Sequence, residues 1–229
     1  MNDCPWPRPW RADAPARQGE HRPDGRRLPL TRVLAIQECS AREIAEAAAV
    51  LRNGGLVAFP TESFYGLGAD ALNADAVARV FRAKGRPDSK PLLVLVNSVA
   101  MAETLVVEIP SGARELMARH WPGPLTLVLN AAPHLPAGLT AGTGTIGIRL
   151  PGHAVARALV EAARVPLTAP SANPSGAPPP TTVSAVQSYL DGVVDLILDG
   201  GNTAGGAGST IADCTSWPPR VLRQGRVVV

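Results

Sequence analysis

From about residue 33 onward, short apolar runs alternate with longer amphipathic segments, and this alternation limits the possible folds more than any other feature of the sequence. Short apolar runs bounded by Gly, Pro and Asn are typical of buried strands, and amphipathic segments are typical of helices. A chain that alternates the two forms an α/β fold. Because several strands follow one another without a helix between them, we expect a single domain with one twisted mixed sheet flanked by helices.

Capping and breaking residues set the bounds of the expected elements. Ser40 and Glu43 match a capping box, Asn73 is a favoured helix N-cap, and Gly85 is a favoured helix end. The expected helices cover residues 40–52, 74–83, 111–120, 153–163 and 182–190. The expected strands cover residues 56–59, 66–72, 91–96, 125–130, 145–150, 166–169, 196–199, 209–213 and 220–222.

Residues 1–32 differ from the rest of the chain because they are rich in Pro and Arg and poor in aliphatic side chains. We expect a flexible extension over 1–32 and a folded domain over 33–229. The extension holds seven arginines against four acidic residues, which accounts for the whole formal net charge of +3. The basicity that would favour RNA binding is therefore a property of the extension, and the domain is neutral overall.

Several protein classes are disfavoured by what the sequence lacks. No apolar run approaches the roughly 18–20 residues of a membrane span, and the first ten residues hold no secretory apolar stretch. The three cysteines are odd in number and far apart, and the four histidines lack metal-ligand spacing. We therefore expect a cytoplasmic protein with reduced thiols, no membrane segment and no metal bound by the protein itself.

Five polar or glycine-rich loops lie at the ends of expected elements, where α/β enzymes carry their sites. The two lysines of the chain, Lys84 and Lys90, fall in one such loop together with Arg86. Clustered cations there indicate either a phosphate or carboxylate site or simply a favourable interaction with a helix C-terminus. The five loops cover residues 60–68, 84–90, 140–145, 169–176 and 199–210.

The other loops add hydroxyl, amide and guanidinium groups but no evident nucleophile or general base. Arg149 interrupts an apolar strand, and if buried it needs an anionic partner such as a bound carboxylate. Ser171 and Asn173 either point at one ligand or form an Asx turn. The 199–210 loop matches no P-loop or dinucleotide fingerprint, so it is a hairpin or an anion-binding loop. This inventory favours a reaction driven by positioning charged substrates.

Seven motifs follow in order across residues 37–226: GLVAFPTESFYGLGA (55–69), KGRPxxKPL (84–92), WPGPLTL (121–127), IRxP (148–151), PSANxSG (170–176), GST (208–210) and LRxG (222–225). Together they resemble the YrdC/TsaC family, the L-threonylcarbamoyladenylate synthases. The resemblance implies a YrdC-like fold and a nucleotidyltransferase that forms threonylcarbamoyl-AMP and pyrophosphate from L-threonine, bicarbonate or CO2, and ATP with its Mg2+. It also implies a partner, a tRNA threonylcarbamoyl transferase complex that modifies adenosine N6.

The same resemblance implies roles for individual residues. Thr61, Arg149 and Ser209 would hold L-threonine. The nucleotide and its phosphates would be held by Lys84, Arg86, Lys90, Thr145, Ser171, Asn173 and Arg223. The catalytic residues among them would be Lys84, Arg86, Ser171 and Asn173.

The sequence also departs from the family pattern. Ser63 and Phe64 replace the more usual Thr-Val pair, and Pro179 stands where many relatives have a small hydroxyl residue near the nucleotide. The chain ends soon after Arg223, which predicts a short form without the extra C-terminal domain. Two alternatives stay open: a double-stranded-RNA or ribosome-associated binding protein, and a related carbamoyl-adenylate-forming enzyme with another acceptor.

Overall fold

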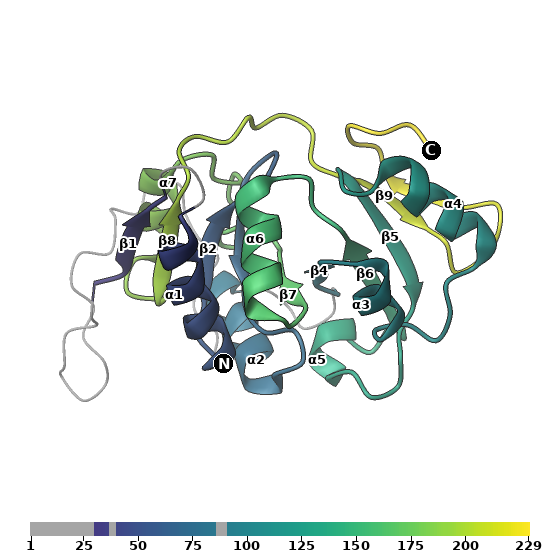
Figure 1. Ribbon diagram of the computed structural model, residues 1–229, viewed down its shortest axis with the longest axis horizontal. Helices are drawn as coiled ribbons and strands as arrows, with labels where there is room; N and C mark the ends of the chain where they lie inside the picture. Colours follow the sequence, from purple (N-terminus) through teal and green to yellow (C-terminus); the bar gives the residue numbers. More distant parts are fainter. Residues whose placement is uncertain (1–29, 37–39, 86–90) are drawn as a thin grey trace, which may run out of the picture.

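The computed structural model describes residues 30–36, 40–85 and 91–229, and two mixed sheets form its framework (Figure 1). In the first sheet, the order is β1 (Arg32–Ala35), β8 (Leu196–Asp199), β2 (Val57–Pro60) and β3 (Tyr65–Gly68). The first three strands are parallel, whereas β2 and β3 form an antiparallel hairpin. The tip of this hairpin is the loop 61–64, which carries the first of the sequence motifs.

The second sheet has six strands and also mixes both pairings. Its order is β10 (Arg220–Arg223), β9 (Thr210–Asp213), β5 (Leu125–Asn130), β6 (Thr145–Arg149), β4 (Leu93–Leu95) and β7 (Leu167–Thr168). The pairs β5–β9 and β4–β6 are parallel, and the other three pairs are antiparallel. The α/β class and the mixed pairing are confirmed.

The single sheet expected from the sequence is divided into two, and the segment 167–171 lies where they meet. Leu167 pairs with Leu95 of β4 and also forms a bridge with Asp70, which follows β3. Ser171 forms a second bridge with Gly66 of β3. Periodicity in the sequence predicts that a strand exists but not which strands it pairs with, so this division was not predictable.

Helices α1 (Ala41–Arg52) and α6 (Ala154–Ala163) pack against each other over one face of the first sheet (Figure 1). The facing sides of these helices are largely Ala, Val and Leu, which form one apolar cluster with β2 and β8. Val57 and Phe59 of β2 belong to this cluster, whereas Ala58 belongs to the cluster on the opposite face. This is the two-residue alternation of a strand buried on both faces.

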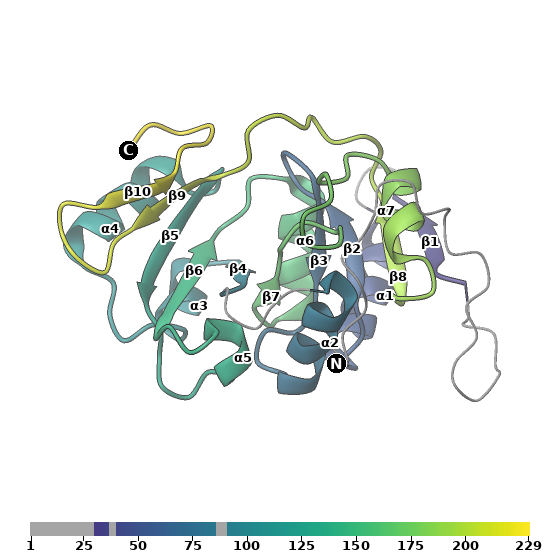
Figure 2. The same ribbon diagram turned by 180° about the vertical axis from the view of Figure 1, so that it is seen from behind.

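The opposite face of the first sheet is covered by α2 (Ala74–Lys84) and α7 (Val183–Leu190), as seen from behind in Figure 2. Three further helices lie beside the second sheet: α3 (Val99–Glu103), α4 (Ser111–His120) and α5 (Ala137–Thr140). In the described ranges, no helix has both the length and the apolar composition that crossing a membrane requires.

Most of the expected elements are confirmed within a few residues, and β1, α3 and α5 were missed. The Asn73 side chain accepts hydrogen bonds from the first turn of α2, and Gly85 ends that helix at φ +53°. Ser40 is the N-cap of α1, but its hydroxyl donates to the Glu43 carboxylate rather than capping a backbone N–H group. Arg32, assigned to the extension by the sequence analysis, lies in β1, while residues 1–29 fall outside the described part of the chain.

Candidate active site

Arg149 is the last residue of β6, and its side chain is only 6% exposed. Its Nε donates a hydrogen bond to the backbone carbonyl of Gly123 at 2.8 Å. Its Nη2 lies 2.5 Å from Oε2 of Glu62. The buried arginine therefore has the anionic partner that the sequence analysis required, and this partner is a residue of the chain.

Glu62 lies in the loop between β2 and β3 and is fixed at both carboxylate oxygens. Oε1 accepts a hydrogen bond from the backbone N–H of Gly152 at 2.6 Å, while Oε2 faces Arg149. Burial acts to raise the pKa of Glu62, but the Arg149 charge and the hydrogen bonds act against it, and the net effect lowers the pKa. The carboxyl group therefore stays ionised beside the arginine near neutral pH.

His153 follows Gly152 at the start of α6 and lies beside the same ion pair. Its Nδ1 is buried and has no hydrogen-bond partner among the described residues. Burial lowers its pKa, the Glu62 carboxylate acts to raise it, and the Arg149 charge lowers it further. The imidazole is therefore neutral near pH 7. His153 was not among the site residues predicted from the sequence, where the histidines were considered only as metal ligands. Its position four residues after Arg149 was the available signal.

Ser209 and Arg223 form a second polar group at the start of β9 and the end of β10. The Ser209 side chain is buried, and its hydroxyl lies 2.9 Å from that of Thr126. Arg223 Nη2 donates to the Ser209 carbonyl at 2.7 Å and to its hydroxyl at 3.2 Å. Partial burial and, after it, the positive charge of Arg149 lower the pKa of Arg223. The two arginines thus contribute positive potential to one region, which favours an anionic ligand.

The loop 61–64 connects these groups. Its Glu62 reaches Arg149, and the Ser63 hydroxyl donates to the carbonyl of Ala207 at 3.2 Å. Thr61 donates to the Phe64 carbonyl at 2.6 Å within the loop. The segment between β8 and β9, which ends at Ser209, crosses from the first sheet to the second in Figure 1. The fold thus gathers Thr61, Arg149 and Ser209 around one loop.

Lys84, Ser171 and Asn173 form a separate cluster. Lys84 ends α2 and is 4% exposed; its Nζ donates to the carbonyls of Ser171 at 2.5 Å and Asn173 at 2.7 Å. Asn173 Nδ2 donates to the Ala177 carbonyl at 2.6 Å, whereas its buried Oδ1 has no partner among the described residues. Carbonyl groups carry no net charge, so the ammonium keeps its full positive charge while it fixes the 171–173 segment.

Four further residues were singled out from the sequence: Thr145, Pro179, Arg86 and Lys90. Thr145 begins β6, four residues from Arg149, which corresponds to about 13 Å along a strand. Its hydroxyl lies 2.9 Å from that of Thr143. Pro179 is exposed. Arg86 and Lys90 lie outside the described residues, so their expected contacts with the nucleotide stay predictions.

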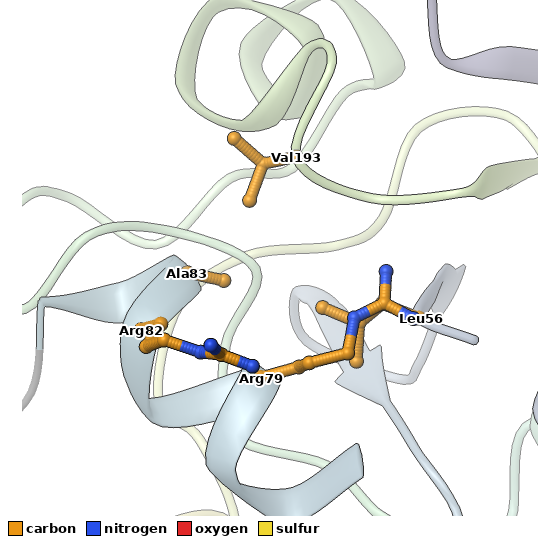
Figure 3. Close-up of a pocket in the computed structure, with 5 residues that line it drawn as sticks. All are labelled: Leu56, Arg79, Arg82, Ala83 and Val193. Atoms are coloured by element: carbon orange, nitrogen blue, oxygen red, sulfur yellow. The ribbon is translucent and has the colours of Figure 1, made fainter. Parts of the chain in front are cut away.

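A pocket of about 230 Å3 between α2 and the turn before β8 is not part of this site (Figure 3). It is lined by Leu56, Arg79, Arg82, Ala83 and Val193, none of which was predicted from the sequence to be a site residue. Arg79 is already bound to the Gly54 carbonyl and to Asp195, both at 2.8 Å. In the described part of the chain, no group of three His, Cys, Asp or Glu side chains is arranged to hold a metal ion.

A buried arginine–carboxylate pair, a second arginine and a carbonyl-bound lysine, at the ends of elements around two mixed sheets, define an α/β protein with a site for anionic ligands. A family model described as "Telomere recombination", that of Sua5, YciO and YrdC, matches residues 49–225. The chain belongs to the Sua5/YciO/YrdC family.

Curated relatives and solved structures agree with this assignment. The chain is 48% identical over 183 residues to the threonylcarbamoyl-AMP synthase of Pyrococcus abyssi, covering 80% of this chain and 54% of the relative. It is 46% identical over 186 residues to the Bacillus subtilis protein of that name, covering 81% and 54%. The structure of P. abyssi Sua5 complexed with L-threonine superposes with a TM-score of 0.81 at 44% identity, covering 86% of this chain and 58% of that one. This chain spans about half the length of these relatives.

Proposed function

We propose that this protein is an L-threonylcarbamoyladenylate synthase, which forms threonylcarbamoyl-AMP and pyrophosphate from L-threonine, bicarbonate or CO2, and ATP. The observation that carries the proposal is the buried guanidinium of Arg149, whose Nε donates to the Gly123 carbonyl and which forms an ion pair with Glu62. The names of the relatives and the L-threonine in the P. abyssi structure support the same assignment.

On the amino-acid side, Arg149 would bind the carboxylate of L-threonine, because a fixed guanidinium forms strong charge-assisted hydrogen bonds to carboxylates. Glu62 and the Gly123 carbonyl hold the guanidinium in place before the substrate arrives. Thr61 and Ser209 would contribute hydroxyl groups to the same substrate, and Arg223 would add positive charge beside Ser209.

On the nucleotide side, Lys84 would supply positive charge, and Asn173 Oδ1 would accept a hydrogen bond from the nucleotide. Arg86, Lys90, Thr145, Ser171 and Arg223 complete the proposed set. Attack of a threonine carbamate on the α-phosphate concentrates negative charge, and positioned cations stabilise such a transition state. Mg2+ would enter with ATP as part of the substrate, bound to its phosphates.

A direct assay tests the proposal. The protein is incubated with ATP, MgCl2, bicarbonate and labelled L-threonine, and both products are measured by chromatography and a pyrophosphate assay. We expect pyrophosphate release that depends on L-threonine. Arg149→Lys keeps a cation beside Glu62 but loses the planar fork, so we expect kcat/KM for L-threonine to fall by about 10²–10³-fold. The matched control is Arg157→Lys on the exposed face of α6. Absence of threonine-dependent product from the wild-type protein would overturn the proposal.

The finer biological assignments are part of the same proposal. The product would pass to a tRNA threonylcarbamoyl transferase complex. Weak RNA binding stays a prediction, because the charge that motivates it lies in residues 1–32, of which 1–29 fall outside the described structure. The cytoplasmic location is likewise a prediction from the sequence.

A further inference from the structure

The loop 205–208, which leads into Ser209, is held from two sides by residues that no role yet explains. On one side, the Gly205 N–H donates to the Ser63 carbonyl at 2.8 Å, and the Ser63 hydroxyl donates to the Ala207 carbonyl at 3.2 Å. On the other side, Arg226 Nη2 donates to the Gly205 carbonyl at 2.7 Å, and its Nε donates to the Ala207 carbonyl at 3.1 Å. Arg226 therefore binds two alternate carbonyls of the loop at once.

The backbone that carries Arg226 is itself fixed against β9. We call residues 223–227 the C-terminal strap. The Thr210 hydroxyl accepts hydrogen bonds from the N–H groups of Gly225 and Val227, both at 3.0 Å. A Cβ atom at Gly225 would lie 2.3 Å from the Gly208 carbonyl oxygen, so only glycine allows this close approach. The strap thus gives the Arg226 side chain a rigid base.

The loop needs such support because its own sequence is flexible. Gly205 and Gly206 have φ values of +64° and +74°, in the left-handed region that glycine adopts without steric cost. Glycine adopts many other conformations as easily, so these residues do not by themselves hold the loop in this shape. Ordering a glycine-rich segment costs more conformational entropy than ordering other residues. A planar guanidinium that donates hydrogen bonds to two carbonyls offsets part of this cost. The ammonium group of a lysine lacks the rigid, planar arrangement of donors that reaches both carbonyls at once.

We propose that Arg226 is a positioning residue for the amino-acid side of the site: it holds the 205–208 loop so that Ser209 is presented to the substrate. This inference rests on the proposed function, because Ser209 is assigned to L-threonine there. Arg226 acts through the loop and does not contact the substrate. Its loss therefore affects L-threonine more than ATP, since its guanidinium binds only loop carbonyls that lead into Ser209, whereas Lys84 and Asn173 bind the 171–177 segment.

The test compares Arg226→Ala and Arg226→Lys with Arg220→Ala in the full chain. Arg220 is the matched control, because it is an exposed arginine on neighbouring β10 whose partner is Asp213. Hydrogen–deuterium exchange of residues 205–208 reports on loop order, and calorimetry reports on L-threonine binding. Steady-state kinetics give KM for both substrates and kcat.

We expect Arg226→Ala to raise amide exchange in the loop by about tenfold and to weaken L-threonine binding by about tenfold. KM for ATP should change by less than about twofold, Arg226→Lys should recover part of the loss, and Arg220→Ala should resemble wild type. Unchanged loop exchange, or faster exchange with unchanged L-threonine binding, would refute the positioning role. A wild-type protein that binds L-threonine but makes no product would instead count against the proposed function. In that case, loop exchange and L-threonine binding in the variants would still test the positioning role of Arg226.

Discussion

Replacing Glu62 by Gln removes the negative charge that partners the buried Arg149 while keeping nearly the same side-chain shape. In the native protein, one carboxylate oxygen faces Gly152 and the other faces Arg149. Gln offers one acceptor oxygen and one NH2 donor. It can therefore satisfy either the Gly152 N–H or the Arg149 guanidinium, but not both, and it leaves Arg149 as a buried cation without a counterion.

The expected loss of folding stability follows from how little water reaches the Glu62–Arg149 pair. The side chains of Arg149 and Glu62 are 6% and 17% exposed, so solvent screens their interaction weakly. Breaking a buried ion pair by removing one partner costs about 3–5 kcal/mol. Because Gln can still accept the hydrogen bond from the Gly152 N–H, we expect a loss near the lower limit, about 3 kcal/mol. For a chain of this length, that loss lowers Tm by about 6–12 °C.

The assay is urea unfolding at pH 7 followed by far-ultraviolet circular dichroism, with Glu103→Gln as the control. Glu103 pairs with Arg114 at 2.8 Å, but these side chains are 45% and 50% exposed. Exposed pairs contribute less than about 1 kcal/mol, so the control should unfold almost like wild type. If Glu62→Gln loses no more stability than Glu103→Gln, the reasoning about the buried pair is refuted.

The pH dependence gives a second check on the same variant. The pKa of Glu62 is lowered in the folded state from an ordinary value of 4.5. Its stabilising contribution is therefore complete above about pH 4.5 and is lost as the pH falls through the folded-state pKa. The stability difference between wild type and Glu62→Gln should be full at pH 7 and should shrink below about pH 4.5. A difference that stays constant down to pH 3 would contradict the assignment.

Two further predictions concern the other buried groups. Lys84→Met leaves the carbonyls of Ser171 and Asn173 without their hydrogen-bond donor, which costs about 1–3 kcal/mol for each carbonyl. Both the thermal stability and the turnover of this variant should therefore fall. The control Arg82→Met, in the same helical turn, should change neither by much. For His153, burial and Arg149 hold the folded-state pKa below 6.5, so acidification below that value destabilises the native protein. His153→Asn should lose less stability between pH 7.5 and 5.5 in urea unfolding; an identical loss in both proteins would argue against a buried neutral imidazole.

Local sequence signals predicted the elements of this fold because their causes act over a few residues. The strand at 125–130, the helix at 111–120 and the Asn73 cap depend on alternation, amphipathicity and a nearby side-chain oxygen. The short helices α3 and α5 were missed because five and four residues are too few to show a helical period. The strand β1 was missed because its pairing with β8, a strand far away in the sequence, defines it.

In the candidate site, too, some features follow from the local sequence and others only from the tertiary structure. The sequence by itself determined which residues carry charge and hydroxyl groups, and it required an anionic partner for a buried Arg149. Only the tertiary structure decided that this partner is Glu62, that His153 lies beside the pair, and that Lys84 binds backbone carbonyls. The physical reason is range: helix caps and strand periods arise within a few residues, whereas the pairing of buried charges depends on which distant loops the packing of two sheets brings into contact.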